Sequence, residues 1–126
     1  MIDTTIRNPD NEAHSARIKP VGRLVRVRRG GTLLAESERA VRVLETGRDI
    51  YDPVIYLPEA DLEGALTPVH GKSTHCPLKG EAAYFAHEGE EVAWTYDRPL
   101  DSALMLKGLI AFDPSKVVLE EVGADA

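Results

Sequence analysis

The stretch Thr74-His75-Cys76-Pro77-Leu78-Lys79-Gly80-Glu81-Ala82-Ala83-Tyr84-Phe85 holds the chain's only cysteine together with a histidine, a lysine and two aromatic residues. A second block, Val92-Ala93-Trp94-Thr95-Tyr96, contains the only tryptophan. Between the blocks lies Ala86-His87-Glu88-Gly89-Glu90, a polar segment with a glycine, which is typical of a β-hairpin turn. We therefore predict that the two blocks are paired antiparallel strands and that they mark a candidate site.

Short strands are also predicted on the N-terminal side of these blocks. Val25 and Val27 alternate with arginines, which is the period of a half-buried strand. The glycines of Arg29-Gly30-Gly31-Thr32 favour a tight turn. Further strands are predicted at 33–36, 39–44 and 54–57, the last between Pro53 and Pro58. The strands predicted at 24–28, 33–36 and 39–44 form a meander.

Two short helices are expected among the strands. One begins at Pro58, with acidic residues in its first turn, and the other runs from Asp101 to Lys107. We expect residues 69–73 to form a loop, and 109–112 and 117–119 to form the last strands. The predicted organisation is an irregular N-terminal arm at 1–22, a single domain at 23–122 and a tail at 123–126.

The bulk composition restricts the classes of function. The chain has 126 residues and a net charge of -6, which argues against a general affinity for nucleic acid. One cysteine can form neither an internal disulfide nor a zinc ribbon. No apolar run approaches the ~20 residues of a membrane span, and the N-terminus does not resemble a signal peptide. We expect a cytoplasmic protein that does not bind membranes.

A series of short motifs resembles the bacterial domain of unknown function 427 family, which some classifications label a nucleotidyltransferase. The motifs are Arg28 to Thr32, Tyr56 to Pro58, His75-Cys76-Pro77-x-Lys79-Gly80 with Tyr84, Ala93-Trp94-x-Tyr96, and Pro99. The resemblance runs from about Arg23 to Phe112 and implies a mainly β, β-tent-like fold. That fold has two small antiparallel sheets meeting at an angle, as in methionine sulfoxide reductase B and the thalidomide-binding domain of cereblon.

This chain departs from the related proteins in two respects. Zinc-binding β-tent proteins use two Cys-x-x-Cys pairs, and this sequence has none, so the resemblance implies no structural zinc. The family's usual aromatic stretch after the last core strand is Asp113-Pro114-Ser115 here. We predict neither a metal nor a cofactor.

Cys76 and His75 are the candidate catalytic residues. A cysteine is a nucleophile when a nearby base or cation lowers its pKa, and His75 is the adjacent base. Neighbours in a strand point to opposite faces, however, so the pair can meet only if Pro77 bends the chain. His70 and His87 are alternative bases. The other interpretation of Cys76 is a small buried core residue.

The candidate ligand-binding residues combine aromatic rings with a cation. They are Tyr56, Lys79, Tyr84, Trp94 and Tyr96. The rings are either pocket walls or core packing. Lys79 and Gly80 suit a phosphate or carboxylate, but Lys79 reaches the face of Trp94 only if the backbone from Cys76 to Gly80 is irregular. The acids Glu59, Asp61 and Glu63 either hold a divalent ion for nucleotidyl transfer or begin a helix.

Three hypotheses for the function follow. The first is a domain that binds a small polar or anionic ligand in an aromatic-lined pocket. The second is an enzyme that uses Cys76 and His75 in a redox or transferase reaction, including nucleotidyl transfer. The third is a structural or interaction module, in which the motif serves folding. The sequence leaves the small-molecule partner unidentified and a homodimer open.

Overall fold

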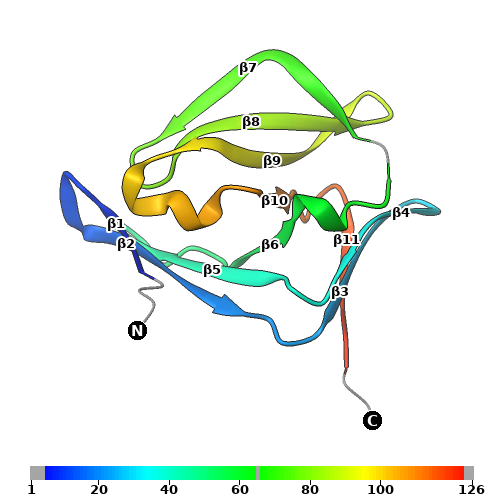
Figure 1. The fold of residues 1–126 in the computed structure, drawn as a ribbon, viewed down its shortest axis with the longest axis horizontal. Helices are drawn as coiled ribbons and strands as arrows, with labels where there is room; N and C mark the ends of the chain where they lie inside the picture. The colour runs from blue at the N-terminus through cyan, green and yellow to red at the C-terminus, as the bar shows by residue number, and fades with distance from the viewer. Residues whose placement is uncertain (1–4, 65, 124–126) are drawn as a thin grey trace.

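Antiparallel strands account for most of the fold (Figure 1). The computed structural model describes residues 5–64 and 66–123. Its strands are β1 (Thr5–Asn8), β2 (Asn11–Pro20), β3 (Leu24–Arg29), β4 (Thr32–Ser37), β5 (Val41–Thr46), β6 (Val54–Pro58), β7 (Thr67–Cys76), β8 (Gly80–His87), β9 (Glu90–Pro99), β10 (Leu109–Phe112) and β11 (Val118–Val122). Two short 3-10 helices, η1 (Glu59–Asp61) and η2 (Asp101–Leu106), complete the described elements.

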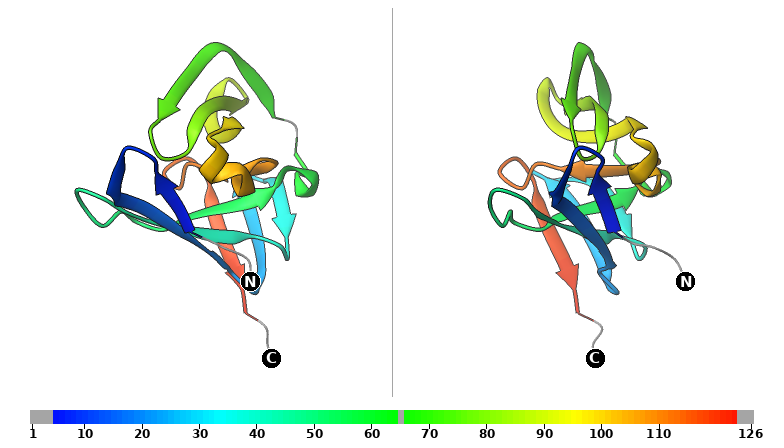
Figure 2. Two further views of the ribbon diagram at one scale, coloured as in Figure 1. Left: turned by 60° about the vertical axis from the view of Figure 1, so that its left-hand side comes forward. Right: turned by 90° about the vertical axis from the view of Figure 1, so that its left-hand side faces the viewer.

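The strands form two antiparallel sheets of unequal size. The larger sheet has eight strands in the order β1-β2-β5-β6-β10-β9-β8-β7, and the smaller has three in the order β11-β3-β4. The large sheet is strongly curved, and η2 lies inside the curve (Figures 1 and 2). The prediction of a mainly β fold with two antiparallel sheets and few helical residues is therefore confirmed, although one sheet is much larger than the other.

The centre of the large sheet is buried on both faces, as β6 illustrates. Ile55 and Leu57 point to one face, where they pack with Val25, Val27 and other residues of the small sheet. Tyr56 points to the opposite face and joins a second apolar cluster with Ala103 and Leu106 of η2. A continuous apolar run between two prolines is what a strand buried on both faces requires.

The predicted hairpin is confirmed as β8 and β9. Its turn lies at Glu88 and Gly89, which have φ angles of 51° and 82°. Two successive positive φ values are typical of the two-residue turns that suit strand twist. Tyr84 of β8 pairs directly with Trp94 of β9, so the two rings lie on the same face.

The predicted irregular arm at 1–22 is wrong for most of its length. Residues 5–8 and 11–20 form β1 and β2, and the turn cluster at Pro9 and Asp10 joins them into a hairpin at the edge of the large sheet. Ile6 and Ala16, paired in register, are buried in the second apolar cluster. The sequence shows little alternation of apolar and polar residues here, because β2 lies next to the edge strand β1 and carries polar residues at most positions. Residues 1–4 and 124–126 lie outside the described part of the chain.

Three smaller predictions also need correction. Residues 69–73, expected to be a loop, belong to β7, an edge strand whose register with β8 shifts between Pro68 and Ser73. The helix expected after Pro58 is only the three-residue turn η1. The last strand begins at Val118 and continues to Val122.

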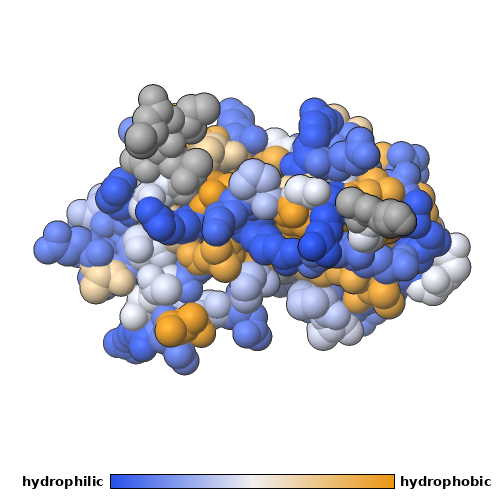
Figure 3. Space-filling model, turned by 90° about the horizontal axis from the view of Figure 1, so that it is seen from below, coloured by the Kyte–Doolittle hydropathy of each residue, from blue (hydrophilic) through white to orange (hydrophobic). Residues whose placement is uncertain are grey.

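Charged and polar side chains cover most of the face seen in Figure 3, with apolar side chains between them. Within the described residues, no helix is long and apolar enough to span a membrane.

The burial of Ile6 allows a test of whether β1 belongs to the folded body. Ile6→Ala should lower the free energy of unfolding by about 2 to 4 kcal/mol, because it removes buried methyl groups and leaves a cavity. Ile50→Ala is the matched control, since Ile50 is 82% exposed and should change stability by less than about 0.5 kcal/mol. Urea denaturation measures both values. Equal stability of the two variants would mean that β1 does not pack on the domain.

Candidate functional site

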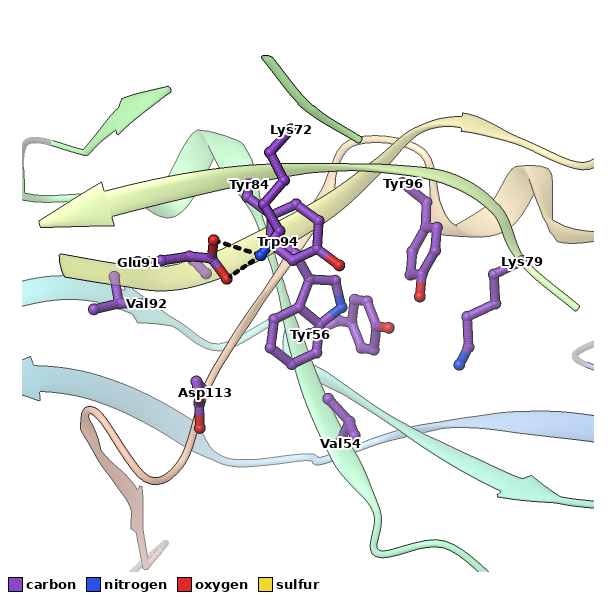
Figure 4. Close-up of a pocket in the computed structure, with 11 residues that line it drawn as sticks. Val54, Tyr56, Lys72, Lys79, Tyr84, Glu91, Val92, Trp94, Tyr96 and Asp113 are labelled. Carbon is purple, nitrogen blue, oxygen red and sulfur yellow. Dashed lines mark hydrogen bonds and ion pairs between the residues drawn. The ribbon is translucent and has the colours of Figure 1, made fainter. Parts of the chain in front are cut away.

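The face of the large sheet that carries Trp94 borders an open cavity of about 360 Å³ (Figure 4). All five predicted ligand-binding residues line it: Tyr56, Lys79, Tyr84, Trp94 and Tyr96. The aromatic rings come from β6, β8 and β9, which are not consecutive in the sheet, because β10 lies between β6 and β9. Lys72 of β7, Glu91 of β9 and Asp113, after β10, also line the cavity.

Lys79 reaches the cavity because the backbone between β7 and β8 turns sharply. The Lys79 amide donates a hydrogen bond to the Cys76 carbonyl at 3.2 Å, and the Leu100 amide donates to the Lys79 carbonyl at 2.9 Å. Gly80 has a φ of 116°, and a Cβ there would lie 2.6 Å from the Arg98 carbonyl oxygen. The geometric condition for Lys79 to share a cavity with Trp94 is thus met.

A carboxylate compensates the burial of Lys79, which is only 8% exposed. Its Nζ lies 2.5 Å from Oε1 of Glu45 on β5, and 5.8 Å from the centre of the Tyr96 ring. Burial alone lowers the pKa of Lys79, but the hydrogen bond to Glu45 and the charge of that carboxylate oppose it, and the pKa lies above its usual value. Lys79 is therefore a charged donor at neutral pH.

Glu45 is held in turn by a residue of β2. Its Oε2 accepts a hydrogen bond from His14 Nε2 at 2.8 Å, and His14 Nδ1 lies 3.1 Å from Nδ2 of Asn8 on β1. Burial raises the pKa of Glu45, yet the hydrogen bonds from His14 and Lys79 outweigh that effect and leave the pKa below its usual value. A series of hydrogen-bonded polar side chains therefore connects β1 to the cavity.

The two tyrosines beside Lys79 are also hydrogen-bond donors. Tyr56 is almost fully buried, and its ring lies beside the Trp94 indole (Figure 4). Burial raises the pKa of Tyr56 and of Tyr96, so both phenols stay protonated at neutral pH. Figure 4 shows the two hydroxyls between the Trp94 indole and Lys79. This part of the cavity, with Tyr56, Tyr96 and Lys79, is called the donor end below.

The opposite part of the cavity is bounded by an exposed ion pair. Lys72 Nζ lies 2.7 Å from Oε1 of Glu91, and it sits 4.2 Å from the centre of the Tyr84 ring. The Tyr84 hydroxyl and Thr74 Oγ1 are 2.6 Å apart, which ties β7 to β8 at this point. These contacts fix the Tyr84 ring in its place beside Trp94.

The structure does not bring the candidate catalytic pair together. Cys76 is half-buried and packs against the apolar cluster around Tyr56. It is therefore neither a fully exposed thiol nor a fully buried core residue. His75 is exposed and lies 2.6 Å from Oε1 of Glu81. His87 is buried at the hairpin turn, where its Nδ1 accepts from Arg29 at 3.0 Å. His70 is exposed on β7.

No group of three His, Cys, Asp or Glu side chains among the described residues is arranged to hold a metal ion. The acids at η1 lie away from the cavity lining. Asp61 accepts hydrogen bonds from Ser37 at 2.5 Å and Arg39 at 2.9 Å, so it anchors the β4–β5 turn. The structure therefore does not place these acids beside the aromatic residues.

Sequence reasoning missed Glu45, His14 and Asn8. Glu45 could have been found from the rule that a buried lysine needs a carboxylate partner, but the sequence offers many carboxylates and no way to choose among them. His14 and Asn8 lie in the segment that was predicted to be irregular.

The comparison with family models gives a match over residues 17–123 to NTP_transf_9, described as a domain of unknown function (DUF427). The chain belongs to the DUF427 family. The predicted membership is confirmed. A search of curated proteins found no match.

The DUF427 match includes Glu45, Lys79 and all four aromatic residues of the cavity, whereas Asn8 and His14 precede it. The Lys79–Glu45 ion pair at the donor end thus lies within the part of the chain that matches the family. Asn8 and His14, the residues of β1 and β2 that support Glu45, lie outside that part. Asp113, where the DUF427 resemblance implies an aromatic stretch, lines the cavity in this chain.

The Gly80 backbone gives a first prediction for this site. Gly80→Ala should lower the free energy of unfolding by roughly 3 kcal/mol or more, because φ is positive and the new methyl group would collide with the Arg98 and Leu100 backbone. Gly71→Ala is the control, because Gly71 has a φ of 78° but open space around it, and it should cost only about 1 to 2 kcal/mol. Thermal and urea denaturation compare the two. A smaller loss for Gly80 would contradict the tight turn.

A second prediction concerns the acid dependence of stability. Because folding lowers the pKa of Glu45, the ionised carboxylate stabilises the fold above its usual pKa of 4.5, and this stabilisation is lost as the pH falls below that value. Glu45→Gln should cost roughly 2 kcal/mol or more at pH 7, since it leaves Lys79 without its counter-charge.

The measurement is the free energy of unfolding of wild type and Glu45→Gln between pH 7 and pH 3. The difference between the two proteins should be constant above about pH 4.5 and should shrink below it. Glu59→Gln, at an exposed position on η1, is the control. A difference that stays the same down to pH 3 would show that Glu45 is not the stabilising carboxylate.

Proposed function

We propose that this domain binds a small flat molecule that carries a polar or anionic acceptor group. The observation that supports this best is one cavity with aromatic side walls and a cluster of hydrogen-bond donors at one end. Its volume of about 360 Å³ lies within the range of small-molecule sites, which are largely apolar with a few polar groups that fix orientation.

The aromatic walls favour a planar ligand. Tyr84 and Trp94 are paired across β8 and β9, and both side chains are only partly buried, so part of each ring surface faces the cavity. Stacking of a planar group on such rings is favourable, on the order of 1 kcal/mol beyond the burial of apolar area. A planar molecule therefore fits the walls better than a branched aliphatic one.

The donor end favours a hydrogen-bond acceptor. Tyr56 and Tyr96 are protonated phenols, and Lys79 uses one of its three N–H groups for Glu45. The remaining donors are set in place by packing before a ligand arrives, which reduces the entropy lost on binding. A carbonyl, carboxylate or phosphate oxygen is complementary to them.

The other two hypotheses have less support. A reaction of Cys76 with His75 needs the two side chains together, and His75 instead pairs with Glu81. A purely structural module is expected to fill its core, whereas the aromatic residues here leave an open cavity. Binding is the function that uses all of these features.

The test is a screen of planar aromatic fragments by saturation-transfer NMR, which observes the ligand and does not depend on a protein signal. Wild type should bind several fragments, and Trp94→Leu should lose at least about tenfold in affinity because a wall of the cavity is removed. Tyr51→Leu is the matched control, since Tyr51 is an exposed aromatic residue outside the cavity lining.

Tyr84→Leu serves as the second wall variant if Trp94→Leu does not fold. No binding by wild type, or equal binding by wild type and a folded wall variant, would reject the proposal.

A further inference from the structure

We infer that the cavity selects an uncharged acceptor, such as an amide carbonyl, over a carboxylate or a phosphate. This inference rests on the proposed function and narrows its ligand class. It follows from the charges that surround the donor end, and above all from the pairing of Lys79 with Glu45 at 2.5 Å.

The hydrogen bonds around His14 show that this residue is neutral. Asn8 Oδ1 accepts from the Asp10 amide at 2.9 Å, so the Asn8 Nδ2 group, a donor, faces His14. His14 Nδ1 must then be an acceptor, and its Nε2–H donates to Glu45. A protonated His14 would place two donors against each other. The network therefore adds no positive charge to Lys79 and Glu45.

Glu45 cancels much of the attraction that Lys79 would exert on an anion. A ligand oxygen about 3 Å from the ammonium would lie roughly 4 to 5 Å from the carboxylate, and Coulomb energy falls as 1/r, so about half or more of the attraction is lost. The cost of removing a carboxylate or phosphate from water remains in full. A neutral carbonyl accepts the same hydrogen bond with a much smaller desolvation cost.

The other charges that line the cavity do not favour an anion either. Lys72 is paired with Glu91, and Asp113 contributes a further carboxylate. Together with Lys79 and Glu45, two cations face three carboxylates. Hydrogen bonds from Ser115 and the nearby Lys116 lower the pKa of Asp113, so it is ionised at neutral pH. The cavity thus has no excess positive charge.

Matched pairs of planar probes test the inference: benzamide and benzoate, nicotinamide and nicotinate, 2-naphthamide and 2-naphthoate. Trp94 is the only tryptophan, so its indole N–H gives a single resonance in a ¹H–¹⁵N spectrum. The shift of that resonance in a titration at pH 7 yields the Kd of each probe. For wild type, each amide should bind at least about fivefold more tightly than its carboxylate partner.

Two variants change the charge without removing a wall of the cavity. Glu45→Gln should improve carboxylate binding relative to amide binding by about tenfold, because the repelling charge is removed. Asp113→Asn should have the same effect by about twofold to threefold. The Asp113→Asn side chain keeps the Oδ1 acceptor that both Ser115 hydrogen bonds use, so this variant retains the local turn and serves if Glu45→Gln does not fold.

The outcomes separate the inference from the proposed function. If the carboxylates bind wild type as tightly as the amides, or if neither folded variant changes the ratio, the inference is overturned and the binding function stands. If no probe of any pair shifts the Trp94 resonance, the binding function and the inference are both overturned.

Discussion

The burial of one lysine is the constraint on which the cavity depends. An unpaired ammonium cannot be removed from water at an acceptable cost, so Lys79 needs a carboxylate within contact distance. Glu45 meets this need from β5, which is third in the order of the large sheet, whereas Lys79 precedes β8, the seventh strand. The two can touch only if the sheet curves strongly, and Figure 2 shows this curvature from two further sides.

The curved sheet determines what the inner face can hold. Small residues at several inward positions, such as Ala82 and Ala111, let the strands come close and leave space beside the larger rings. Trp94 and Tyr56 then fill part of that space, with the Trp94 indole beside the Tyr56 ring (Figure 4).

The N-terminal hairpin has a function in this arrangement that its composition conceals. Its apolar side chains close one end of the second cluster, and its polar side chains orient Glu45 toward Lys79. A residue such as His14 is therefore a positioning residue for the donor end, since it acts on the cavity through Glu45. The position of the Glu45 charge beside the cavity is consequently set in part by β2, although no β2 residue lines the cavity.

The sequence alone determined the β class, the β8–β9 hairpin and the rings that share its face, because period-two alternation and turn residues are local signals. It named Pro77 and Gly80 as residues that can interrupt a strand near Lys79, but it left open whether the backbone turns there. It could not determine the strand order of the large sheet or the choice of Glu45 among many acidic residues. Those depend on contacts between residues 34 positions apart, which only the curvature of the assembled sheet decides.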